Sequence, residues 1–232
     1  MVQAKLSTIR EWAPAMSEPY SALLRLQLPR ERLARWLAAP VPAASRWDDW
    51  RSIAGRWRLP GGVDLAASSD VELGEFLSDC TAMLARHADN RAALAGILES
   101  AQAENIKVAA YDQAGAYFVA GSLTYSENLY DLVVFLAMAR GAADFLEPGE
   151  HGVALVHDYL WAEDGERETV AAVHLAGKGD SGFMTPAQSG QTAATFDAMV
   201  ELMLDGADDP QFTPRNQFDR VQDRAHAAQS GR

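Results

Sequence analysis

The fold is decided by residues 117–140, YFVAGSLTYSENLYDLVVFLAMAR, in which a strand pattern gives way to a helix pattern. We expect a strand over 117–125 that forms a hairpin with residues 106–111, with the turn at 113–115. A helix is expected over about 128–145. Its residues are apolar nearly all round, so this helix should be central and buried.

The same order of elements returns farther along the chain. Residues 153–161 and 169–175 predict a second hairpin across Asp164-Gly165, which is a recognised tight-turn pair. A last helix is expected over about 192–204 because Phe196, Met199, Val200 and Met203 fall on one helical face. Two hairpin–helix units favour a mostly antiparallel sheet with helices packed on one face, which is an α+β fold. The likeness lies in the order of the elements and does not establish a duplication.

Earlier in the chain the pattern predicts one strand and three helices. The strand covers residues 20–28, and a helix over 30–39 is ended by the prolines at 40 and 42. The clearest helix is 69–87, which starts with the capping box Ser69-x-x-Glu72 and carries an apolar stripe that includes Cys80. Asn90 is expected to cap a further helix.

Charged residues are distributed unequally along the chain. The net charge is −12, yet residues 1–60 hold ten basic and only five acidic residues, together with five of the six tryptophans. We expect three parts in one compact domain: a basic, Trp-rich segment at 1–66 packed on the body, an α+β body at 67–206, and a flexible polar tail at 207–232. The uneven charge has two interpretations, namely docking of the basic segment on the acidic remainder, or separate surfaces for separate partners.

Composition excludes several classes of protein. A chain of 232 residues with 48% hydrophobic residues is neither collagen-like nor wholly disordered. One cysteine permits no internal disulfide. The longest apolar run, 132–139, is too short for a bilayer, and residues 1–6 lack the apolar segment of a secretory signal. We expect a soluble, cytoplasmic protein with no membrane partner.

A glycine-rich stretch matches a nucleotide-binding pattern only superficially. Residues 177–182, GKGDSG, fit G-x-G-x-x-G after a predicted strand. The dinucleotide fingerprint needs a helix to open at the motif, because the helix N–H groups hold the pyrophosphate. Residues 183–186 intervene here, so we expect a flexible loop over 177–190 and no cofactor.

The five histidines offer one candidate constellation. No pair has the spacing of a zinc site, so no metal site is expected. If Asp164-Gly165 is a two-residue turn, position 157 pairs with 172 and position 155 with 174. His157, next to Asp158, and His174 would then be diagonal neighbours on one face of the sheet. This group is the alternative site, for a small molecule or a hydrolytic reaction, although a one-residue change of register would separate it.

Acidic residues gather at the tip of the second hairpin. One interpretation is a solvated acidic face, and the other is a recognition surface for a basic protein. On the second interpretation, the partner-binding residues are Tyr159, Trp161, Glu163, Asp164, Glu166 and Glu168.

The tryptophan-rich segment does not favour nucleic acid. Arginines flank Trp47, Trp50 and Trp57, but Asp48 and Asp49 lie between the first two, and the net charge would repel a polyanion. Core packing or an interface, including that of a homo-oligomer, suits these tryptophans better.

The sequence shows no catalytic set and leaves enzymatic activity undecided. It favours an acidic protein-binding domain that neutralises or sequesters a basic protein, in the manner of an immunity protein against a bacterial toxin.

Overall fold

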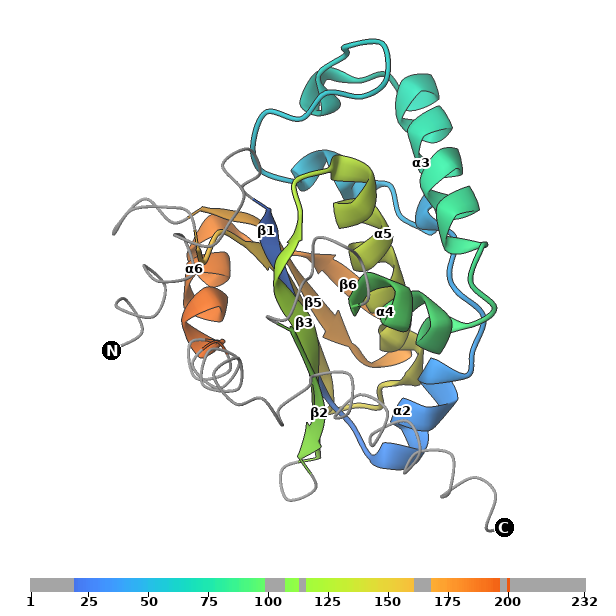
Figure 1. The fold of residues 1–232 in the computed structure, drawn as a ribbon, viewed down its shortest axis with the longest axis vertical. Coiled ribbons are helices and arrows are strands. Elements are labelled where there is room, and N and C mark those ends of the chain that lie inside the picture. Colours follow the sequence, from blue (N-terminus) through green and yellow to red (C-terminus); the bar gives the residue numbers. More distant parts are fainter. Residues whose placement is uncertain (1–18, 99–106, 113–115, 161–167, 197–199, 201–232) are drawn as a thin grey trace.

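Six antiparallel strands form one sheet with five helices packed against it, which confirms the expected α+β fold (Figure 1). The computed structural model describes residues 19–98, 107–112, 116–160, 168–196 and 200. The strand order is β2-β3-β1-β4-β5-β6. The bounds are β1 Tyr20–Gln27, β2 Lys107–Asp112, β3 Tyr117–Ser126, β4 His151–His157, β5 Thr169–Ala176 and β6 Asp180–Phe183. Both expected hairpins are present, as β2–β3 and β4–β5.

The strand near the N-terminus lies in the middle of the sheet. β1 pairs with β3 on one side and with β4 on the other. Its side chains alternate between the two faces, so that Leu24 and Leu26 pack in one core and Leu23 in the other. The basic segment therefore supplies a central strand of the sheet as well as the turns that follow it.

The helices cover both faces of the sheet, unlike the expected arrangement on one face. The bounds are α2 Arg30–Leu37, α3 Asp70–Leu84, α4 Asn90–Leu98, α5 Leu129–Arg140 and α6 Pro186–Thr195. The first four share one core with Leu24, whereas α6 packs on the opposite face with Leu155 and Ala172. Figure 1 shows α6 alone on its side of the sheet among the labelled helices.

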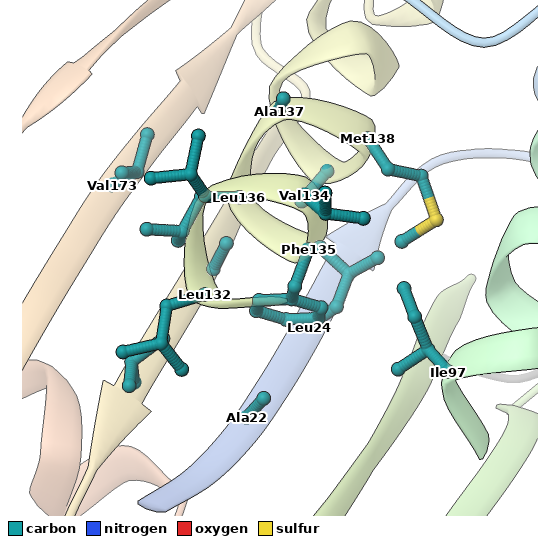
Figure 2. Close-up of a cluster of buried hydrophobic side chains, with 14 of the residues drawn as sticks. Ala22, Leu24, Ile97, Leu132, Val134, Phe135, Leu136, Ala137, Met138 and Val173 are labelled. Carbon is teal, nitrogen blue, oxygen red and sulfur yellow. The ribbon is translucent and has the colours of Figure 1, made fainter. Parts of the chain in front are cut away.

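Helix α5 is central and buried, as its apolar pattern predicts. Every residue from Leu132 to Arg140 is buried, and a 3-10 turn over Gly141–Phe145 continues the helix. Figure 2 shows Leu132, Phe135 and Leu136 beside side chains of the sheet such as Leu24 and Val173. No helix among the described residues is long and apolar enough to cross a membrane.

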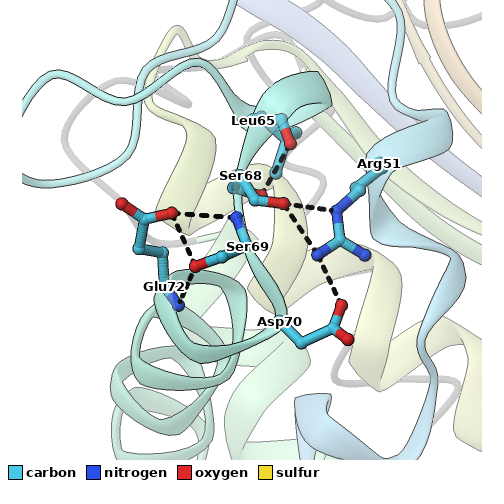
Figure 3. Close-up of polar contacts among 6 residues, drawn as sticks. All are labelled: Arg51, Leu65, Ser68, Ser69, Asp70 and Glu72. Atoms are coloured by element: carbon cyan, nitrogen blue, oxygen red, sulfur yellow. Dashed lines mark hydrogen bonds and ion pairs between the residues drawn. The ribbon is translucent and has the colours of Figure 1, made fainter.

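The start of α3 is fixed by the capping box expected from the sequence (Figure 3). The Glu72 N–H donates to Ser69 Oγ at 3.3 Å, and the Ser69 N–H donates to Glu72 Oε2 at 2.8 Å. Arg51 donates to the Ser68 carbonyl and, at 2.9 Å, to Asp70 Oδ1. These bonds join the 3-10 turn Asp49–Ser52 to the first turn of α3.

We expect Ser69→Ala to lower the free energy of unfolding by about 1 kcal/mol, because one N–H at the helix start loses its acceptor. Urea denaturation followed by circular dichroism measures the change. The matched control is Ser78→Ala, at an exposed position in the same helix. An equal effect of the two substitutions would show that the capping box contributes nothing specific.

The cap of α4 differs from the one expected. Asp89 Oδ1 accepts the Ala92 N–H at 2.8 Å, so the aspartate before Asn90 is the capping residue. Asn90 is buried, and its amide donates to the carbonyls of Trp36 and Ala39 at the end of α2. Asn90 is a residue type that favours helix caps, but here its side chain joins α4 to the end of α2.

Residues 177–190 are ordered secondary structure instead of the expected flexible loop. A 3-10 turn over Gly177–Gly179 leads into β6, and α6 begins at Pro186, six residues before the expected start at 192. Thr185 and Gln188 form a second capping box there. The expected tail at 207–232 lies outside the described residues.

Candidate functional site

One half of a sheet face is covered by none of the described helices. α6 covers the part of its face that contains Leu23, Leu155 and Ala172, which are buried. The next two rows of residues along the same strands are only partly buried or exposed. We call them the open sheet face, and the strand register places Ala110, Val119, Arg25, Val153, His174 and Gly182 in one row and Asp112, Tyr117, Gln27, His151, Ala176 and Asp180 in the next, so that an aspartate stands at each edge of the second row.

The open sheet face carries three nitrogen-bearing side chains. The Arg25 guanidinium lies over the Tyr117 ring, 4.2 Å from its centre. His174 pairs with Val153, and His151 pairs with Ala176, so the two imidazoles are diagonal neighbours. His174 Nε2 lies 3.9 Å from Asp180 Oδ1 on the edge strand β6. These groups suit the binding of a carboxylate or another acceptor. Because only the strand register brings these side chains together, no local sequence pattern pointed to Arg25 and His151.

The expected placement of His157 and His174 as diagonal neighbours is wrong. His157 pairs with Thr169, and the register shifts between Val156 and His157. The two histidines share a face, but His174 is level with Val153, four residues or about 13 Å along β4 from His157. His157 is buried, with Nδ1 2.9 Å from Thr169 Oγ1 and its ring packed on Tyr159. The Asp158 N–H donates to the Glu168 carbonyl at 3.0 Å.

The expected partner-binding residues fall into three groups. Tyr159 is only 2% exposed, and its hydroxyl donates to the Ala193 carbonyl of α6 at 2.7 Å. It therefore anchors α6 and does not belong to an exposed surface. Glu168 is exposed at the start of β5. Trp161, Glu163, Asp164 and Glu166 lie outside the described residues.

A second acidic surface lies where α3 packs on α5. We call it the α3–α5 acidic surface, and it consists of Glu75, Asp79, Glu127 and Asp131. The first three are exposed and form no ion pair with any described residue. Burial and then the neighbouring Asp79 carboxylate raise the pKa of Tyr130 above its usual value, which places the negative charge of α3 beside α5.

Four arginines in the described part of the chain form ion pairs with the protein's own carboxylates. Arg32 pairs with Glu147 and Glu150, Arg46 with Asp144, Arg51 with Asp70, and Arg140 with Asp49. The first three pairs hold the basic segment against the acidic remainder. These pairs neutralise the four arginines where they contact the rest of the protein. None of them involves a carboxylate of the α3–α5 acidic surface.

Arg140 occupies a buried cage that the sequence did not reveal. Its guanidinium donates to both carboxylate oxygens of Asp49, at 2.6 and 3.1 Å, and to the Ser181 hydroxyl and carbonyl. The guanidinium also lies over the rings of Trp47, Trp50 and Phe183. Four donations and three rings leave little room for a ligand, so this cage joins α5, β6 and the Trp-rich turns.

Cys80 is unsuited to nucleophilic catalysis. Burial raises the pKa of its thiol to about 12, with a further contribution from Asp79, so the reactive thiolate is scarce at neutral pH. The described residues hold no group of three His, Cys, Asp or Glu side chains that could bind a metal ion. Comparisons with protein families, with curated proteins and with solved structures found no match to this chain. The functional argument therefore depends on the surfaces.

Proposed function

We propose that this protein binds a basic protein partner and neutralises or sequesters it, in the manner of an immunity protein against a toxin. The observation that carries the proposal is the α3–α5 acidic surface, whose exposed carboxylates have no ion pairs among the described residues. With a net charge of −12, the protein attracts a basic partner over distances beyond direct contact. Charge of this kind raises association rates and suppresses binding to acidic proteins.

The composition of α3 supports the same proposal. The helix contains four acidic and no basic residues. Glu75 and Asp79 are one helical turn apart, and like charges at this spacing destabilise a helix by about 0.2–0.5 kcal/mol. A surface that keeps such a pair without a compensating lysine suits a partner that supplies the positive charge.

Two surfaces compete for the contact, and the chain provides matched variants. One variant replaces Glu75, Asp79 and Glu127 by lysine, and the other replaces Asp164, Glu166 and Glu168 by lysine. Each changes the net charge by the same amount, so each controls for the long-range effect of the other. Wild type and both variants are used to capture proteins from cells that make the chain, and the Kd of the captured protein is then measured.

We expect the captured protein to be basic. The triple-lysine variant whose substitutions lie within the contact surface should bind this protein with a Kd about 100-fold or more above that of wild type. That change corresponds to about 3 kcal/mol, which is typical of charged pairs at an interface. The variant with its lysines outside the contact should raise the Kd less. A captured protein that is not basic, or equal Kd values for wild type and both variants, would contradict the proposal.

A catalytic use of His157, Asp158 and His174 has no support from the geometry. His157 is buried and contacts Thr169 and Tyr159. His174 lies two rows of the sheet away from His157, beside Asp180. General acid–base catalysis needs the acting groups within hydrogen-bond reach of one substrate. We therefore propose the binding of a basic protein and no catalytic role for these three residues.

A further inference from the structure

The open sheet face differs in chemistry from the α3–α5 acidic surface. Its partly exposed centre is Arg25, Val119 and Val153, flanked by His151 and His174. We propose that this face binds a short acidic segment of a protein, with a carboxylate held by Arg25. This second binding surface would accept a different partner from the basic protein proposed above.

The size of the face favours a short segment. Six strands, each about 4.8 Å wide, and two rows, each about 6.6 Å deep, give an area of about 380 Å². A stable protein–protein interface buries about 800 Å² on each partner. A segment of about six to eight residues in extended conformation fits the smaller area, because it spans about 20–26 Å.

The position of Arg25 argues against a second copy of the chain. β1 lies near the middle of the sheet, so a twofold face-to-face pairing about the centre would bring Arg25 close to its equivalent. Two like charges held together in an interface are unfavourable. An occupant that carries a carboxylate avoids this repulsion.

Charge complementarity supports an acidic occupant. Arg25 forms no ion pair with any described carboxylate, and its position over Tyr117 holds the guanidinium in place. A guanidinium can donate two parallel hydrogen bonds to one carboxylate. His151 and His174 add nitrogen atoms close by, while Ala110, Val119 and Val153 provide apolar contact. The one described carboxylate at this end of β6, that of Asp180, already lies beside His174.

The test uses two matched peptides and the full-length protein. Acetylated peptides of eight residues, one of alternating valine and glutamate and one of alternating valine and lysine, are titrated into ¹⁵N-labelled protein. The glutamate peptide should shift the amide signals of Arg25, Val119, Val153 and His174. The lysine peptide should leave these four signals unchanged.

Arg25→Gln should weaken binding of the glutamate peptide about tenfold, as expected for the loss of a charge-assisted hydrogen-bonding group. Arg25→Lys keeps the charge and should weaken it less, while Arg35→Gln, at an exposed position of α2, should have no effect. Dispersed amide spectra show that each variant is folded. Shifts confined to the edge strands β2 and β6, equal shifts with both peptides, or unaltered binding by Arg25→Gln would overturn the proposal. Failure of this test leaves the proposal for α3 and α5 standing, since the two use different residues and opposite charges.

Discussion

Replacing Asp49 by alanine is expected to lower the free energy of unfolding by about 3 kcal/mol, because it leaves a buried guanidinium without its counter-charge. The Arg140 side chain is only 1% exposed, whereas that of Asp49 is 33% exposed. Partial access of water near Asp49 favours the lower end of the usual range of about 3–5 kcal/mol. Urea denaturation followed by tryptophan fluorescence measures the effect, since Trp47 and Trp50 flank Arg140.

Two further variants separate the ion pair from simple loss of a side chain. Asp48→Ala, at the exposed neighbouring position, should change stability by less than about 0.5 kcal/mol. Adding Arg140→Met to Asp49→Ala removes the uncompensated charge and should restore part of the lost stability. A loss below about 1 kcal/mol for Asp49→Ala, equal to an ordinary hydrogen bond, would refute the claim that this pair joins α5 to the Trp-rich turns.

The second large effect is expected for Phe135→Ala, which should destabilise the protein by about 3–5 kcal/mol. Phe135 is fully buried in α5, and its ring lies 5.8 Å from that of Tyr125 on β3. Truncation removes apolar contact and leaves a cavity between the helix and the sheet. Thermal unfolding and urea denaturation both measure the loss.

Val71→Ala is the matched control for Phe135→Ala, because Val71 is 70% exposed on α3 and should contribute within about 0.5 kcal/mol. Phe135→Leu keeps more of the volume and should cost clearly less than Phe135→Ala. Equal losses for the leucine and alanine variants would contradict the view that packing volume at the centre of α5 sets the effect.

Much of the fold could be predicted because its signals are local. The uniform apolar character of 128–145 predicts a buried helix, and Ser69 with Glu72 marks a helix start that depends only on neighbouring residues. Strand alternation likewise predicted both hairpins. Thr185, Pro186 and Gln188 contain an equivalent signal for the start of α6, so that element could also have been found.

The features that escaped prediction depend on distant contacts. His157 pairs with Thr169 and not with position 172, and the register then shifts by one residue, so that His174 pairs with Val153. No local pattern specifies either change. In the sequence, Arg140 is only a polar residue near the end of an apolar helix. Its partners Asp49 and Ser181 are distant in sequence and come close to it only in the folded chain. Arg25 and His151 are 126 positions apart in a chain of 232 residues, yet they lie on adjacent strands of one face.

The central claim is that charge on the protein surface brings a basic partner to it. Its most direct test is the association rate constant for the purified partner, measured from about 0.05 to about 0.3 M NaCl, a range over which screening of exposed charges changes strongly. We predict that the wild-type rate constant falls at least tenfold across this range. The variant with lysine at positions 75, 79 and 127 should associate more slowly and depend less on salt. A rate constant that is independent of salt and equal in the two proteins would contradict the account.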